Sequence, residues 1–239
     1  MKDLAGNLYA GTTTYDFFTL DTVLPTVTAF SPADSATGVP GASNIVLTFS
    51  EAIQKGAGVI AIHSGSVDGP AVASYDAATN TSNLTFSGNT LTINPTADLA
   101  NDGTHYFITL APGTIYDLAG NLYAGTTSYD FTTVDTTPPT VTAFSPTDAT
   151  TGVAVGSNIV LTFSETIQKG TGAIEIHAGS ETGTLLEPAY DAATNSSNLT
   201  FSGNTLTINP TNTLATDTHY FVTFAAGSVK DSILSLIHI

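Results

Sequence analysis

Apolar and polar residues alternate in short runs along this chain, and clusters of Gly, Pro, Asn, Asp and Ser separate the runs. In the run Ile45–Phe49, for example, the first, third and fifth residues are Ile, Leu and Phe, and they share one face. This period of two is typical of a β-strand that buries one face. No stretch sustains a helical period, so we expect an all-β fold.

The same pattern predicts a set of short strands in the first half of the chain. They are expected over residues 27–30, 44–49, 59–63, 83–86, 90–93, 105–110 and 126–134. Gly88 and Asn89 separate two of them and tolerate a positive φ, which predicts a tight hairpin. Short alternating strands without a long helix indicate a two-sheet antiparallel sandwich.

A duplication divides the chain. The stretch Asp117–Phe131 repeats Asp3–Phe17 with one change, Thr14 to Ser128, and the stretch that begins at Asp21 returns from Asp135. A period this long suits tandem domains with separate cores better than the unit of a solenoid. We therefore expect an orphan last strand of a preceding repeat over 1–20, a complete module over 21–134, and a truncated module over 135–231 that lacks its last strand.

The correspondence between the two modules stops after Asp231. Residues 232–239 have no counterpart, and their last six, Leu-Ser-Leu-Ile-His-Ile, resemble the in-frame translation of a transposon-end sequencing adaptor. We expect this tail to be a read-through artefact. A natural apolar terminus is the alternative.

Four motifs in a fixed order carry a family resemblance. They are Thr-Pro-Pro-Thr-Val at 137–141, Asn-Ile-Val-Leu-Thr-Phe-Ser-Glu at 44–51, Thr-His-Tyr-Phe-Ile-Thr-Leu at 104–110 and Asp-Leu-Ala-Gly-Asn at 117–121. Together they resemble the bacterial Ig-like domain of S-layer proteins and large repetitive cell-surface adhesins. The resemblance implies tandem Ig-like β-sandwiches that serve outside the cell as a stalk, spacer or lattice element. The second module departs from the pattern where Asp-Leu-Ala-Gly-Asn should recur.

The composition of the chain argues against nucleic acid and membranes as partners. Charged residues make up only 10% of the chain, and 20 Asp and Glu against 4 Lys and Arg give a formal charge of -16. Such a surface repels phosphate backbones and anionic lipid headgroups, so neither nucleic acid nor membrane insertion is expected. The absence of Cys excludes disulfide and thiolate chemistry, and this fits an extracellular or a cytosolic home.

Six acidic residues are candidate calcium ligands. They follow the second strand of each module, flank the linkers or begin the final turn: Asp21, Glu51, Asp117, Asp130, Asp135 and Glu165. Calcium takes six to eight hard oxygens in flexible geometry, and a strand end, a turn and a linker can supply them together. The alternative is that the Asp residues at turns serve backbone hydrogen bonding. The polar loop Asp76–Asn80 admits the same two interpretations.

No other motif points to chemistry. His63 and His105, and their copies His177 and His219, form two pairs without Cys, a His-Glu-x-x-His motif or an expected carboxylate partner, so we interpret them as structural. No nucleophile motif and no acid pair is present. The chain is therefore expected not to be an enzyme and to need no cofactor other than calcium.

Two functions remain open at this stage. The leading hypothesis is a structural spacer of a large cell-surface protein, whose partners are the neighbouring Ig-like repeats. The alternative is a module that binds glycan or protein through its variable loops, 64–74 and 178–189. Residues 3–19 also carry the strand that the second module is expected to lack, which predicts strand donation between copies.

Overall fold

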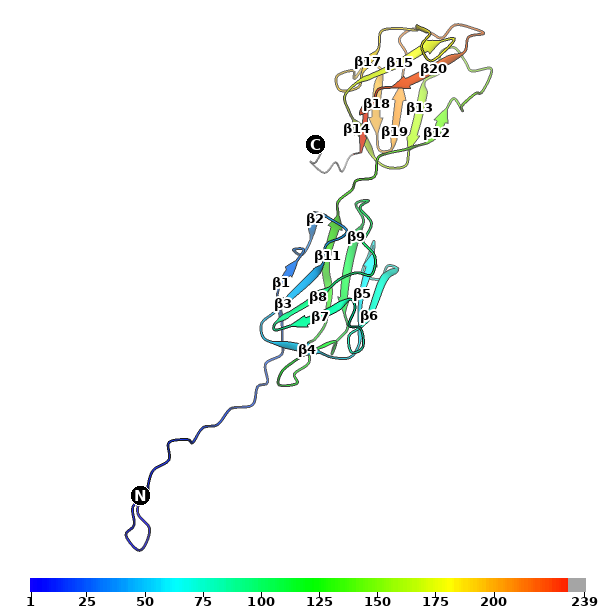
Figure 1. Cartoon of the computed structure of the whole chain (residues 1–239). Helices are drawn as coiled ribbons and strands as arrows, with labels where there is room; N and C mark the ends of the chain where they lie inside the picture. Colours follow the sequence, from blue (N-terminus) through cyan, green and yellow to red (C-terminus); the bar gives the residue numbers. More distant parts are fainter. Residues whose placement is uncertain (232–239) are drawn as a thin grey trace. The chain divides into compact units, whose positions relative to one another are not determined.

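The structure is a computed structural model that describes residues 1–231, so the interpretation of the tail lies outside the described residues. Over residues 1–231 the chain forms β-strands and no helix (Figure 1). The all-β expectation is therefore confirmed. In this part of the chain there is consequently no apolar helix of the length that a membrane span requires.

The chain folds into two compact units. One unit comprises Met1–Ala36, Ser43–Ala97 and Tyr106–Phe131; the other comprises Thr37–Ala42, Asp98–His105 and the chain from Thr132 onward. The segments 37–42 and 98–105 lie within the first sequence repeat but belong to the second unit.

The first repeat folds into two facing sheets and a small third one. Its strands are β1 (Val27–Ser31), β2 (Ala36–Val39), β3 (Ile45–Phe49), β4 (Ile53–Lys55), β5 (Val59–Ser64), β6 (Ala71–Asp76), β7 (Leu84–Ser87), β8 (Thr90–Ile93), β9 (His105–Leu110), β10 (Ile115–Asp117) and β11 (Thr126–Thr133). One sheet has the order β1-β3-β8-β7, the other β2-β11-β9-β5-β6, and β10 pairs with β4.

Register places the alternating apolar residues in the core. In the antiparallel pair β3–β8, Ile45 lies opposite Ile93 and Leu47 opposite Leu91, and all four side chains are fully buried. A slip of one residue in either strand would turn that strand's two apolar side chains to the other face of the sheet, so burial fixes the pairing. The expected hairpin between β7 and β8 is confirmed, with Gly88 at a φ of 58° between the paired residues Ser87 and Thr90.

Strand β11 closes the first core. Tyr129 and Phe131 on this strand are each 1% exposed. The ring of Tyr129 stacks on Phe30 at 4.1 Å between centroids, and its hydroxyl donates to the carbonyl oxygen of Pro32 at 2.8 Å. The last strand thus ties the two sheets of the sandwich together.

The second repeat builds the same framework from β12 onward. Its strands are β12 (Val141–Ser145), β13 (Ile159–Phe163), β14 (Ile167–Lys169), β15 (Ala173–Ala178), β16 (Thr184–Leu185), β17 (Tyr190–Asp191), β18 (Leu199–Ser202), β19 (Thr205–Ile208), β20 (Tyr220–Phe224) and β21 (Val229–Asp231). One sheet has the order β12-β13-β19-β18; β15 pairs with β16, β17 and β20 in the other; and β14 pairs with β21.

The second sandwich has no counterpart of β2 or β11 within the described residues. Strand β20 pairs only with β15 there, whereas its equivalent β9 lies between β5 and β11. All five residues of β20 are half-buried, while β9 alternates between buried and half-buried residues. As far as residue 231, the second module thus has the open edge that the sequence predicts.

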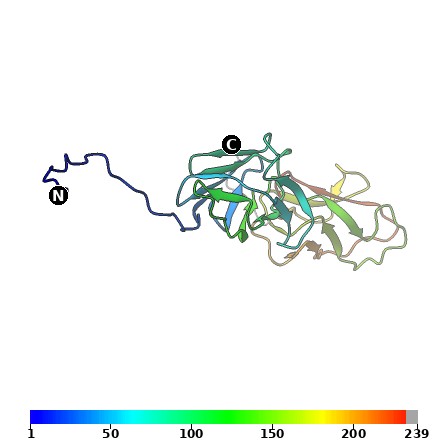
Figure 2. The same cartoon turned by 90° about the horizontal axis from the view of Figure 1, so that it is seen from below.

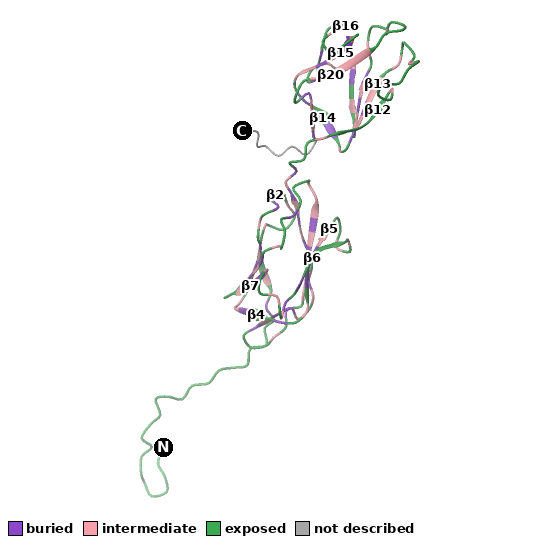
Figure 3. Ribbon diagram, turned by 45° about the vertical axis from the view of Figure 1, so that its right-hand side comes forward, coloured by how far each residue is buried: buried purple, intermediate pink, exposed green. Residues whose placement is uncertain are grey.

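Residues 1–20 contain no strand. Figures 1 and 2 draw this segment as a dark-blue trace without an arrow, and Figure 3 colours it as exposed. Its one isolated β-bridge joins Lys2 and Leu8. The expected orphan strand does not form, because a single strand has no neighbour to accept its backbone hydrogen bonds.

Four short strands escaped the sequence pattern. In the first repeat they are β2, β4, β6 and β10. Strands β4 and β10 have only three residues each, and β2 and β6 contain small residues such as Ala and Gly or Ser, so none of them shows a clear alternation. The predicted loop 64–74 is therefore partly wrong, since its last residues, from Ala71, begin β6 and pair with β5. Residues 65–70 remain a loop.

Candidate functional site

Three carboxylates meet at one end of the first sandwich. Asp21, Glu51 and Asp117 each offer a carboxylate oxygen, and these oxygens lie within 4.8 Å of one another. Asp117 is fully buried, Glu51 is half-buried and Asp21 is exposed. Hard, anionic oxygens at this spacing are ligands that suit Ca²⁺.

The fold positions each of the three residues from a different element. Glu51 follows β3 at the bend before β4, and Asp117 is the last residue of β10, opposite Ile53 on β4. The side chain of Gln54 donates to the Asp117 carbonyl at 2.8 Å and fixes this pairing. Asp21 comes from the segment before β1, and its carbonyl accepts a bond from Asn121 Nδ2 at 3.3 Å.

Asp117 also organises its own turn. Its Oδ1 accepts from the backbone N–H of Asn121 at 2.8 Å, and its Oδ2 accepts from the Asn121 side chain at 2.6 Å. Burial would raise the pKa of Asp117, but these hydrogen bonds outweigh it and lower the pKa. Carboxylate oxygens have further lone pairs, so the turn and a cation are compatible.

Glu51 shows the opposite electrostatic response. Desolvation raises the pKa of its carboxyl, and the negative charges of Asp117 and Asp21 raise it further. The three carboxylates therefore repel one another when no cation is bound. A proton on Glu51 or a divalent cation among the three relieves this repulsion.

The second sandwich repeats the arrangement. Carboxylate oxygens of Asp135, Glu165 and Asp231 lie within 4.8 Å of one another, with Asp231 at the end of β21 and Glu165 after β13. Desolvation again raises the pKa of Glu165, followed by the charges of Asp135 and Asp231. Together with Asp102, Thr137, Ser164 and Thr166, the three acids line an open hollow of the second unit.

The structure thus brings together five of the six predicted acidic residues. Asp130 belongs to neither group; it lies on β11, where its N–H donates to Asp34 Oδ1 at 3.2 Å and its carbonyl accepts from Ser35 N at 2.9 Å. Asp231 was missing from the predicted set. The repeat could have found it, because Asp231 occupies the place of Asp117 in the second copy.

The histidines of the third strands have structural roles. His63 Nδ1 contacts the Gly69 carbonyl at 3.0 Å, and His177 Nδ1 contacts the Gly183 carbonyl at 3.1 Å. Each ring therefore anchors the loop that follows its strand.

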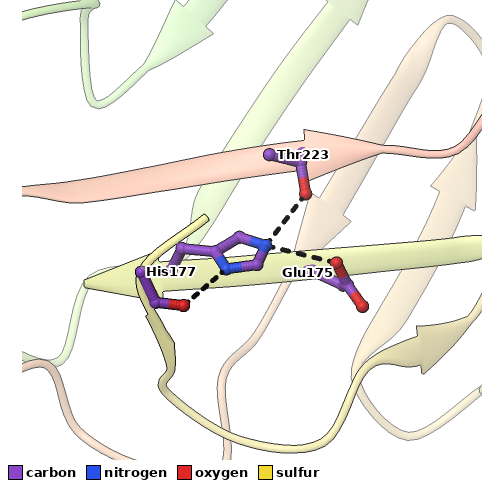
Figure 4. Close-up of polar contacts among 4 residues, drawn as sticks. Glu175, His177 and Thr223 are labelled. Carbon is purple, nitrogen blue, oxygen red and sulfur yellow. Dashed lines mark hydrogen bonds and ion pairs between the residues drawn. The ribbon is translucent and has the colours of Figure 1, made fainter. Parts of the chain in front are cut away.

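The expectation that no carboxylate lies near these histidines is wrong for His177. Its Nε2 lies 3.2 Å from Glu175 Oε2 and 3.2 Å from Thr223 Oγ1 (Figure 4). The equivalent of Glu175 in the first module is Ala61, so this contact is not duplicated. In the described part of the chain, neither group of three possible metal ligands includes a histidine.

The polar loop after β6 is an Asx turn. Asp76 Oδ1 accepts from the backbone N–H of Ala78 and of Thr79, both at 2.9 Å, and Asp191 does the same in the second module. These bonds, those from the Thr79 side chain first, lower the pKa of Asp76. Of the two interpretations of this loop, the structure supports the turn.

A model of the family described as bacterial Ig-like domain matches residues 21–133 and, again, 135–235. The chain belongs to this family. The matched segments follow the sequence duplication, and the Ig-like resemblance and the tandem antiparallel sandwiches expected from the sequence are confirmed.

Two further comparisons add little to the bacterial Ig-like assignment. The comparison with curated proteins returns no match. A solved structure titled "Tandem Ig repeats of Dlar" is 13% identical, aligns over 87% of this chain and 94% of its own, and has a TM-score of 0.21, which is too low to carry an argument.

Proposed function

We propose that this pair of bacterial Ig-like domains is a structural spacer in a cell-surface protein. The observation that carries the proposal is the duplication of one sandwich framework together with its group of three acidic residues. Repetition of a whole domain adds length with each copy. Strands of five or six residues span about 17–20 Å, so each added sandwich extends a stalk by tens of ångströms.

Location and chemistry agree with this role. Domains of the family usually occur in extracellular or surface proteins. The chain has a formal charge of -16 although only 10% of its residues are charged, so neighbouring stalks repel one another. With 4 Lys and Arg in all, it offers no basic surface to anionic partners. The non-catalytic role stays a prediction from the absence of a catalytic motif in the sequence.

A display experiment tests the spacer. A tagged binding domain is anchored to a cell through one, two or four copies of the chain, and capture of a large soluble partner is measured. Capture should rise with copy number and stay unchanged when the loop residues 65–70 and 179–183 are replaced by Gly-Ser segments of equal length. Capture that does not depend on copy number contradicts the proposal.

The second candidate function is binding of glycan or protein through the loops 64–74 and 178–189. These loops differ most between the two modules. Glu187 anchors the second one, since it accepts from Tyr190 Oη and from Thr211 N. Glycan-array or pull-down signal that is lost when the two loops are exchanged favours this function over the spacer.

We also propose that the two acidic groups bind Ca²⁺ and that the bound ions stiffen the spacer. A cation held by Asp21, Glu51 and Asp117 would fasten the segment before β1 to the first sandwich. A cation held by Asp135, Glu165 and Asp231 would fasten the segment before β12 to the second sandwich. Melting temperature should rise with added Ca²⁺ and fall back with chelator. The rise should shrink in the variant E51Q/E165Q, and an equal rise in wild type and variant contradicts the proposed ligands.

A further inference from the structure

Within residues 1–231, an apolar strip of the second sandwich is only partly covered. It consists of Phe144, Val153, Tyr220, Val222 and Phe224, whose equivalents in the first sandwich are Phe30, Val39, Tyr106, Ile108 and Leu110. The five residues of the second sandwich are half-buried or exposed, and Phe144 is 50% exposed. In the first sandwich, Ile108 and Leu110 are at most 1% exposed. The difference arises because β11 lies beside β9 in the first sandwich, whereas β20 has no such neighbour among the described residues of the second.

The chain carries a second copy of the covering strand. Residues 3–17 are identical to residues 117–131 except at Thr14, so they include the sequence of β11 up to Phe131. Tyr15 and Phe17 stand for the fully buried Tyr129 and Phe131. In the N-terminal segment these two side chains are 83% and 74% exposed.

The turn at the start of the N-terminal segment, over residues 3–11, already has the conformation of its copy. Asp3 binds Asn7 N at 2.8 Å and Asn7 Nδ2 at 2.8 Å, as Asp117 binds Asn121. Gly11 has a φ of 90° and its equivalent Gly125 has 95°. Less conformational entropy is lost when a segment binds in a conformation that it already adopts.

We propose that residues 10–19 of one copy pair with β20 of a second copy and complete its sandwich. By equivalence with β11, the Tyr15 ring stacks on Phe144 and its hydroxyl donates to the Pro146 carbonyl. The Asp16 backbone takes the place of Asp130 against Asp148 and Ala149. Ala149 has a φ of 56°, and its equivalent Ser35 has 58°, so this acceptor loop already has the required shape.

The sequence indicates which segment binds to the strip. Residues 10–19 reproduce most of β11, the strand that covers the equivalent residues of the first sandwich. A donor at one end and an acceptor in the second sandwich make a head-to-tail contact between copies. Such a heterologous contact forms open chains unless its rotation closes a ring. The proposed association rests on the unpaired edge of β20. It does not depend on the proposed spacer function.

Sedimentation of the full chain over a concentration series tests the proposal. Wild type should grow in size with concentration. The variant F17D should weaken association about tenfold or more, because it places a charge in the core of the completed sandwich. The matched control is F18D, which places the same charge at the outward position of Thr132 and should associate as wild type does. Equal loss in both variants indicates nonspecific stickiness and overturns the proposal.

A glycine pair provides a second control. A Cβ on Gly125 would lie 2.7 Å from the Leu110 carbonyl oxygen, so G11A should clash with the Phe224 carbonyl of the acceptor. Gly6 also has a positive φ, 89°, but a Cβ on it or on its equivalent Gly120 meets nothing within 4 Å. G11A should therefore weaken association and G6A should not. Equal behaviour of the two variants contradicts the proposed register.

Fluorescence distinguishes a second copy from closure within one chain. The chain has no Trp, so the variant F17W carries a single reporter. Its emission should shift to shorter wavelength as concentration rises. A shift that is already complete at high dilution overturns donation to a second copy, and so does emission that stays solvent-exposed throughout.

Discussion

Individual carboxylates decide the local electrostatics of each sandwich. Glu51 and Glu165 have raised pKa values, while hydrogen bonds lower that of Asp117. A raised carboxyl pKa means that the charged form destabilises the folded state, and a lowered pKa means that it stabilises it. The same cluster therefore contains groups with opposite effects on stability.

The variant E51Q should raise the melting temperature of the metal-free protein at pH 7, because it removes a charge that is partly desolvated and that Asp117 and Asp21 also repel. The gain should shrink as pH falls through the raised pKa of Glu51 and vanish below its ordinary value of 4.5, where wild type is protonated as well. D117N should act in the opposite direction and lower the melting temperature at pH 7. Melting curves between pH 4 and 7 check both, and a destabilising E51Q contradicts the account.

The Tyr129 hydroxyl supplies one of the hydrogen bonds that join the closing strand to the start of the first sandwich. The variant Y129F keeps the stacking on Phe30 but loses the bond to the Pro32 carbonyl, which then stays without this donor. We expect a loss of about 1 kcal/mol in the free energy of unfolding. Urea denaturation measures it, and an unchanged midpoint shows that water replaces the bond.

At the scale of the element, the closing strand explains why equivalent strands differ in burial. β9 has β11 beside it and buries Ile108 fully, while β20 leaves Val222 half-buried. A strand of closely similar sequence therefore contributes less to stability in the second sandwich.

The variant I108A should cost about 2–5 kcal/mol, because it leaves a cavity in a closed core. V222A should cost clearly less, because the site is already half-open and loses less buried area. Denaturation of both variants in dilute solution checks this. A larger cost for V222A would mean that β20 is covered in solution.

The regular strands could be predicted from sequence because their alternation is a direct consequence of one-sided burial. Ile45–Phe49 on β3 is an example. β6 could not be predicted, since its Ala and Ser residues carry no periodic signal and only pairing with β5 makes it a strand. Residues 12–20 show the converse, a strand-like sequence that has no partner.

The sequence predicts that acidic residues form the candidate sites, but it does not show which of these residues lie together. Glu51 and Asp117 are far apart in sequence, and only the β4–β10 pairing brings them together. Asp130 was placed with them by its position near a linker, yet the closing strand holds it beside Asp34. The Glu175–His177 contact was missed because it depends on one substitution between otherwise equal strands.

On the scale of the whole molecule, the chain has two hydrophobic cores, which we expect to fold separately. The first is centred on residues such as Leu91, and the second on Leu206, which occupies the same place in β19. A spacer assembled from independent domains can be lengthened by duplication without redesign of either core.

Scanning calorimetry of L91A and L206A in dilute solution tests this most directly. Both leucines are fully buried, so each variant should lose about 2–5 kcal/mol. We predict two unfolding transitions in wild type, with L91A lowering only one of them and L206A only the other. A single transition that both variants shift equally would show one continuous cooperative unit and contradict the account.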